Sequence, residues 1–265
     1  MGPMILGIEA AQLRLLTWFS PAFPVGAFGY SHGLETAIRE GQVGTADALE
    51  AWILGLLEHG SGWSDAVLFR LAWVADAAEI AELGELAEAL APSRERHRET
   101  MQLGAAFVDA VRPWLSPSPS MGEGLGWGCL QSAADVVSVG ADLGRSAPPS
   151  ALTPYLPLSP IEGERGALPY PVAAGSACAN ADIPLAPALT AWLHGFAANL
   201  VSVAARAIPL GQSNAVRVLA ALEPAILAVA GRAALATRDD LGSCAFLSDV
   251  AAMRHETLQP RLFIS

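Results

Sequence analysis

The sequence contains no lysine: all fifteen of its basic residues are arginine. A phosphate-binding P-loop needs a lysine that reaches the β- and γ-phosphates, and a protein kinase needs the lysine of its third strand. Enzymes that form a Schiff base need a lysine amine as nucleophile. The missing lysine therefore excludes these three classes, and the chain cannot be a standard nucleoside triphosphatase itself.

Cysteine and positive charge are also scarce. The three cysteines, Cys129, Cys178 and Cys244, lie far apart and form no C-x-x-C pair, which favours a reduced, cytoplasmic protein over a disulfide framework. The net charge of −11 and the isoelectric point near 4.8 argue against nucleic-acid binding, which needs clustered positive charge. We therefore expect protein partners and no nucleic acid.

The apolar content is high, with 52% hydrophobic residues and a mean hydropathy of +0.39. The longest uncharged run, residues 183–205, could span a bilayer by length, but it contains Pro184, Pro187, His194 and Asn199. We interpret it as a buried core helix and expect no membrane association. The first residues lack both a basic leader and a myristoylation pattern, so we expect neither export nor a lipid anchor.

Alternating β-branched residues, the signature of strands, are almost absent, whereas apolar residues recur at helical spacing. We predict an all-α, single-domain bundle of about ten helices. Expected helices include one that Thr45 caps and Gly60 ends, one from Ser64, and later segments at 79–90, 93–111, 189–203, 213–229 and 242–254. The charged run 94–99 is expected on the solvent side of its helix.

Residues 115–166 interrupt this pattern because they are rich in proline, glycine and serine. We predict a low-complexity insertion, a disordered loop, between an N-terminal helical half, 1–114, and a C-terminal half, 167–265. The two halves form one structural domain, and the second half carries a C-terminal tail.

The first distinctive sequence segment is 19–35, FSPAFPVGAFGYSHGLE. Its prolines and glycines exclude a regular helix over most of its length. Ser31 is placed to cap a helix that begins at His32 or Gly33. Two interpretations remain open: an ordered loop that lines the core, or a dimer or partner surface. The candidate residues of this loop are Phe23, Phe28, Tyr30, His32 and Glu35.

His32 and Glu35 are three residues apart, a spacing that can place imidazole and carboxylate on one helical face. Two ligands are too few for a tight metal site, so a hydrogen-bonded structural pair is the favoured interpretation. His255 receives the same weak metal assignment. We predict no catalytic residue and no tightly bound cofactor.

The second distinctive segment is the C-terminal tail, MRHETLQPRLF at 253–263, in which cationic and apolar residues alternate. Exposed Leu262 and Phe263 would need to pack on this chain or on a partner, and we favour a partner. A third segment, RAIPLGQSN at 206–214, joins two long helices. Its Arg206, Gln212 and Asn214 are candidates for partner contact, although they could equally cap nearby carbonyls.

These three segments, in this order, resemble those of the urease accessory protein UreF family, and the resemblance covers everything outside 115–166. It implies an all-α homodimer that binds UreD, called UreH in some systems, and the GTPase UreG. It also implies a non-catalytic adaptor chaperone that modulates GTP-dependent nickel insertion into apo-urease, with nickel handled transiently by the complex. On this resemblance the UreD-docking residues are Arg254, His255, Glu256, Arg261, Leu262 and Phe263. The loop at 23–30 and the turn at 206–214 are weaker candidates for dimer and GTPase contact.

One alternative stays open at this point. The chain could be a helical interaction scaffold whose partners have nothing to do with urease.

Overall fold

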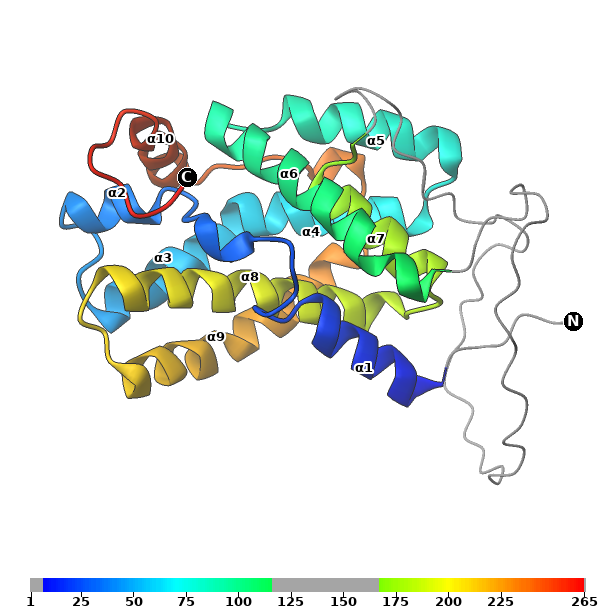
Figure 1. Ribbon diagram of the computed structural model, residues 1–265, viewed down its shortest axis with the longest axis horizontal. Coiled ribbons are helices and arrows are strands. Elements are labelled where there is room, and N and C mark those ends of the chain that lie inside the picture. Colours follow the sequence, from blue (N-terminus) through cyan, green and yellow to red (C-terminus); the bar gives the residue numbers. More distant parts are fainter. Residues whose placement is uncertain (1–6, 116–166, 265) are drawn as a thin grey trace, which may run out of the picture.

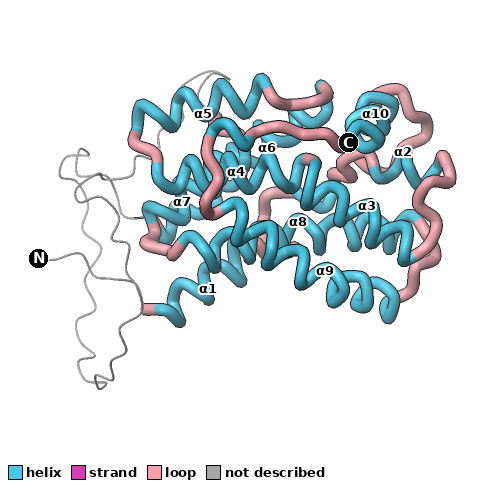
Figure 2. The backbone as a smooth tube through the Cα atoms, turned by 180° about the vertical axis from the view of Figure 1, so that it is seen from behind, coloured by secondary structure: helices cyan, strands magenta, loops and turns pink. Residues whose placement is uncertain are grey.

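The computed structural model describes residues 7–115 and 167–264. These residues form helices joined by loops and contain no strand, which confirms the all-α prediction (Figure 2). The predicted insertion lies, apart from Leu115, outside the described residues. Leu115 itself is buried in the main core.

The first half of the chain contributes six α-helices and two short 3₁₀ turns. Their bounds are α1 Ile8–Trp18, η1 Ala27–Gly29, α2 Leu34–Arg39, α3 Ala46–His59, α4 Ser61–Val74, α5 Ala77–Ala89, α6 Arg94–Val111 and η2 Arg112–Trp114. The second half contributes α7 Tyr170–Asn180, α8 Leu185–Ala207, α9 Gln212–Ala233, η4 Arg238–Asp240 and α10 Phe246–His255.

Local sequence explains several of the helix starts. The Thr45 hydroxyl accepts a hydrogen bond from the Ala48 N–H at 3.2 Å at the start of α3, and Gly60 follows its last residue, both as predicted. Ser93 caps α6 in the same way, through the N–H of Arg96. The helix predicted from Ser64 begins three residues earlier, at Ser61.

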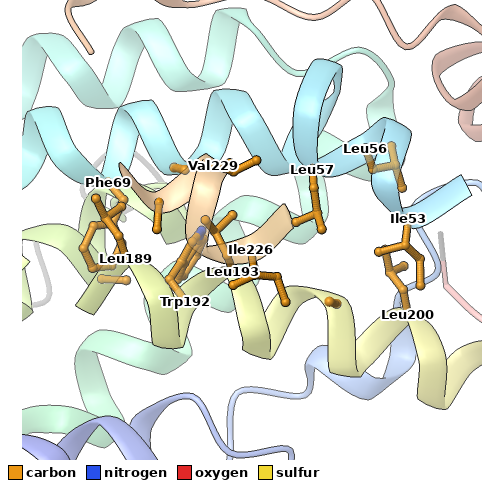
Figure 3. Close-up of a cluster of buried hydrophobic side chains, with 14 of the residues drawn as sticks. Ile53, Leu56, Leu57, Phe69, Leu189, Trp192, Leu193, Leu200, Ile226 and Val229 are labelled. Carbon is orange, nitrogen blue, oxygen red and sulfur yellow. The ribbon is translucent and has the colours of Figure 1, made fainter. Parts of the chain in front are cut away.

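The core lies where helices from the two halves pack together. Helix α8 runs through the middle beside α9, with α3 and α4 against them (Figure 1). Figure 3 shows that Leu57, Leu193 and Ile226 from three of these helices meet, with Trp192 beside them. Helix α8 therefore has apolar residues on several sides because it is surrounded by other helices.

Helices α8 and α9 are long and apolar enough to cross a membrane by length and composition alone. Half of the apolar stretch of α8 is buried among its neighbours, compared with 28% of that of α9. Helix α7 and the residues just before it lie so close to their neighbours that side chains are excluded at two positions. A Cβ atom at Gly104 would overlap the Leu168 carbonyl oxygen, and one at Gly175 would overlap that of Phe69.

Helix α10 packs against α2 and the start of α6 at one end of the molecule (Figure 1). The approach to α2 is possible because Gly33 has no side chain. A Cβ atom there would lie 2.7 Å from the Ala252 nitrogen, and its φ of +76° also favours glycine. This contact brings the C-terminal tail to the segment 19–35.

Candidate functional site

The three specific segments meet at the α10 end of the molecule. The Ile264 N–H donates to the Gly29 carbonyl at 2.7 Å, which ties the tail to the N-terminal loop. The Arg206 guanidinium donates to the Phe28 carbonyl at 2.7 Å and lies 4.6 Å above the Phe263 ring, so the interhelical turn joins both. Segments separated by more than 170 residues therefore form one continuous structure.

Glu35 holds the tail in place through its two carboxylate oxygens. They accept hydrogen bonds from the backbone N–H groups of Leu262 at 2.8 Å and Phe263 at 3.0 Å. Burial alone would raise the pKa of this carboxyl. The two backbone donors and His255 outweigh burial and hold the pKa below its usual range. Glu35 is therefore a carboxylate that recognises the backbone of the tail.

His255 is fully buried between two carboxylates. Its Nε2 lies 3.1 Å from Glu35, and its Nδ1 lies 2.7 Å from Glu95. Each ring nitrogen therefore has a carboxylate partner. Arg261 reaches the other oxygen of Glu95 at 2.6 Å. We name Glu35, Glu95, His255 and Arg261 the His255 cluster.

A second charged group lies beside it, around Arg96. Arg96 Nη1 is 2.6 Å from Glu99, and His32 Nε2 is 2.9 Å from the same carboxylate oxygen. Burial would raise the pKa of Glu99, but Arg96 and His32 lower it to about 2. Asp65 completes this group, 3.6 Å from Arg96. We name His32, Asp65, Arg96 and Glu99 the Arg96 cluster.

The prediction that run 94–99 faces solvent is wrong for three of its six residues. Glu95, Arg96 and Glu99 are 6%, 7% and 2% exposed. The reason is that Glu95 and Glu99 continue the face of α6 that carries Leu103, at intervals of four residues. On this face Glu99 meets His32, which lies just before α2, and Glu95 meets His255 of α10. The spacing was a signal in the sequence, and it was overlooked.

Two predictions about the loop need correction. Ser31 is not the residue that directly precedes α2, because the helix begins at Leu34 after Gly33. The Ser31 hydroxyl nevertheless accepts a hydrogen bond from the Glu35 N–H in the first turn, at 3.4 Å. His32 and Glu35 do not form the expected pair, because each faces a different cluster. His32 instead adopts a left-handed backbone with a φ of +52°, which turns its ring toward α6.

The other loop candidates differ in exposure. Phe23 and Tyr30 are buried, and the Tyr30 hydroxyl donates to Gln102 at 2.7 Å. Phe28 is 63% exposed. The loop thus lines the core on one side and presents a ring to solvent on the other, which agrees with both interpretations left open by the sequence.

The residues of the tail that were predicted to dock a partner also divide into buried and exposed ones. His255 and Phe263 are buried within this chain, and the Glu256 carboxylate accepts from the Arg94 N–H at the start of α6. Arg254 and Leu262 are exposed. Contact with a partner is untested and stays a prediction for all of them.

In the interhelical turn, two candidates bond nearby carbonyls. Asn214 donates to the Leu210 carbonyl at 2.9 Å, and Arg206 donates to that of Ser202. Gln212 is exposed at the start of α9. The carbonyl-capping alternative is therefore real for Arg206 and Asn214, and it leaves open whether a partner also contacts this turn.

Metal binding was a weak prediction for His32, Glu35 and His255. Within residues 7–115 and 167–264, no group of three or more His, Cys, Asp or Glu side chains is arranged to hold a metal ion. The carboxylates near these histidines are instead occupied by arginine and by backbone N–H groups. The His255 cluster joins the tail to α2 and α6, and the Arg96 cluster joins the N-terminal loop to α6 and α4.

Exposed apolar side chains surround the point where tail and loop meet. Phe28 is 63% exposed, Leu262 is 68% exposed and Ile264 is 44% exposed. We name these three residues the tail-loop surface. The buried ion pairs beneath it fix its position, so it is a defined surface rather than the end of a free chain.

Comparison with known proteins gives a consistent result. A family model described as UreF matches residues 43–223. The chain is 42% identical to the urease accessory protein UreF of Rhodopseudomonas palustris strain BisB5, over 99% of this chain and 95% of the relative. It is 44% identical to that of Mesorhizobium japonicum, over 96% of each chain. Relatives from Brucella, named urease accessory protein UreF 1, are 40% identical over 96% of this chain and 94% of their own length. A match of this extent includes the loop and the tail as well as the helical body, and it establishes that the chain belongs to the UreF family of urease accessory proteins.

Proposed function

We propose that this protein is a cytoplasmic adaptor chaperone of urease maturation. It bridges UreD and the GTPase UreG and promotes GTP-dependent insertion of nickel into apo-urease. Family membership supports the urease assignment and disfavours the alternative of a scaffold unrelated to urease. Nickel is the cargo of the assembled complex in this proposal.

The chain acts without catalysing the reaction. Because it has no lysine, it cannot supply the P-loop of a GTPase, so hydrolysis belongs to UreG. A non-catalytic adaptor works by presenting surfaces and by changing how its partners bind. We further propose that the functional unit is a homodimer, as the family resemblance implies.

The observation that carries the proposal is the convergence of the three segments. Loop, turn and tail are held together by Arg206 and Glu35, and the result presents Phe28 and Leu262 to solvent. Large exposed apolar groups next to rigid, ion-paired structure are typical of protein interaction sites. We propose that the tail-loop surface contacts UreD or UreG, while His255 and Glu35 hold it in shape.

The test is reconstitution with purified partners. Wild-type protein is mixed with UreD and with UreG separately and then together, with and without GTP and nickel, and complex stoichiometry is measured by light scattering. The variants Leu262→Glu and Phe28→Ser are expected to weaken one binary complex at least tenfold, because each removes an exposed apolar contact. Activation of apo-urease should fall in parallel.

Leu235→Glu provides a matched control. Leu235 is 83% exposed and lies after α9, outside the tail-loop surface. It should change neither complex. If wild-type protein forms no complex with either partner, the adaptor function is wrong. If complexes form and Leu262→Glu binds as well as wild type, the function stands, but the tail-loop surface is not the contact.

A further inference from the structure

A cavity of about 100 Å³ lies beneath the N-terminal loop, between α6, α7 and α8. Aromatic rings form much of its wall. Phe19 and Trp192 meet edge to face with ring centres 5.7 Å apart, and Phe196 stands edge to face against His32 at 5.0 Å. The wall is therefore largely apolar and rich in aromatic rings, whose faces carry partial negative charge.

Charged groups also line the cavity, and they are those of the Arg96 cluster. Three of them satisfy one another, because Arg96 and His32 both lie within 3 Å of Glu99. Asp65 differs. Its charged neighbour Arg96 is 3.6 Å away, beyond good hydrogen-bond distance, and its side chain keeps 20% of its exposure.

This arrangement leaves Asp65 with acceptor capacity that faces the cavity. A carboxylate has about four lone-pair positions, and the 3.6 Å contact with Arg96 leaves most of those of Asp65 open to the cavity. Burial raises the pKa of Asp65, and Arg96 offsets only part of that effect. A bound cation would supply both the missing donors and the missing charge.

We propose that this cavity is a binding site for an alkyl guanidinium or alkyl ammonium group. Asp65 accepts hydrogen bonds from the cation, and the rings of Phe19, Trp192 and Phe196 face its positive charge. Cations held over aromatic faces gain further stabilisation when water is excluded. The acidic net charge of the chain also favours approach of a cationic group.

Other ligand classes fit less well. An anion would meet the carboxylates of Asp65 and Glu99 with Arg96 already paired. A divalent metal would need three ligating side chains together, which the described residues do not provide. A neutral apolar group would leave Asp65 without a donor.

The cation could come from two sources: an arginine or lysine side chain of a protein partner, or a free small organic cation. The cavity volume admits either a long side chain or a small molecule. The proposal depends on the cavity alone, so it is independent of the urease assignment.

Three probes of similar shape test the charge requirement: propylguanidinium, neutral N-propylurea and the anion pentanoate. Binding to the full chain is measured by saturation-transfer NMR and by tryptophan fluorescence titration. Propylguanidinium should bind saturably, and the two other probes should bind at least tenfold more weakly. Equal binding of the urea, or stronger binding of the anion, would overturn the proposal, as would no saturable binding of the cation.

Asp65→Asn should weaken propylguanidinium binding at least tenfold while keeping the helical circular dichroism spectrum. Asp47→Asn is the control, because Asp47 is 84% exposed and pairs with Arg217 at the surface. Unchanged affinity in Asp65→Asn would overturn the site. If Asp65→Asn fails to fold, Phe196→Leu replaces it and should also weaken binding, because it removes a ring face.

A fourth probe, N-acetylarginine methylamide, separates the two sources. Its backbone amides stand for a polypeptide. Binding at least as tight as that of propylguanidinium would support an arginine side chain from a partner. Loss of binding with this probe, while propylguanidinium still binds, would support a free small organic cation at the same site.

Discussion

The middle of the bundle and its α10 end are held together by different forces. Around Leu193 and Leu200 on α8 the interior is apolar and depends on close packing of helices from both halves of the chain. Around His255 the interior contains two carboxylates, the His255 ring and the Arg261 guanidinium, which are joined by contacts of 2.6 to 3.1 Å. One region is stabilised by burial of apolar area, and the other by directed polar contacts.

This difference has a functional consequence. Apolar packing is non-directional and tolerates modest rearrangement, whereas a hydrogen bond to a backbone N–H fixes the position of one particular residue. Glu35 places Leu262 in this way. A charged interior at the α10 end costs desolvation energy, and in return it sets the tail in one arrangement relative to the loop.

Replacing Glu35 by alanine should have the largest effect. It removes the acceptor of two tail N–H groups and leaves His255 with one carboxylate partner, and breaking a buried ion pair typically costs about 3 to 5 kcal/mol. Denaturant unfolding measures the loss, and hydrogen exchange at Leu262 and Phe263 should become fast.

Glu40→Ala is the control for that variant, because Glu40 follows α2 directly and pairs with exposed Arg254 at the surface. It should change stability by less than about 1 kcal/mol. Equal losses for Glu35→Ala and Glu40→Ala would mean that the buried network does not hold the tail.

Replacing Leu193 by alanine should affect the other region. Leu193 is fully buried on α8, and a leucine-to-alanine change in a core costs about 2 to 5 kcal/mol. Global stability should fall, but hydrogen exchange at Leu262 should stay slow relative to the new global limit, because the tail contacts remain. Preferential loss of protection in the tail would show that the two regions are not separable.

Acid should act on the α10 end first. The pKa of Glu99 is about 2 in the folded protein and near 4.5 when unpaired, so its contribution is present above pH 4.5 and is lost as pH falls toward 2. At 1.36 kcal/mol per unit this is at most about 3 kcal/mol. The lowered pKa of Glu35 has the same sign, while the raised pKa of Asp65 opposes it.

Unfolding free energy measured from pH 7 down to about pH 2 should therefore decrease below pH 4.5. In Glu99→Gln the decrease should be shallower, because one of the titrating carboxyls is gone. An unchanged acid slope in this variant would show that Glu99 titrates alike in folded and unfolded chains.

The fold was largely predictable because helical periodicity is a local signal. The stripe that includes Leu189, Leu193 and Leu200 predicts α8, and Thr45 and Ser93 mark helix starts directly. Helix α10 was predicted from Gly242 but begins at Phe246. The preceding segment makes other contacts instead, such as the hydrogen bond from the Cys244 N–H to the His59 carbonyl.

The site was predicted only in outline. Its three segments were recognisable because their sequences are distinctive. Their convergence, however, depends on contacts between residues more than 200 positions apart in the sequence, such as Glu35 and His255. The α6 residues that pair with His255 and His32, namely Glu95 and Glu99, were not predicted, because charged residues usually lie on solvated faces. The four-residue interval that joins Glu95 and Glu99 to Leu103 outweighs that general tendency here.

The smallest expected effect separates two arginines of the same tail. Arg254 is 60% exposed and pairs with Glu40 at the surface, whereas Arg261 pairs with buried Glu95 at 2.6 Å. Exposed ion pairs contribute about 0 to 1 kcal/mol, so Arg254→Gln should barely change the unfolding midpoint, while Arg261→Gln should lower it measurably. Thermal unfolding of the two variants side by side measures this difference. A larger loss for Arg254→Gln would mean that the surface pair, and not the His255 cluster, anchors the tail.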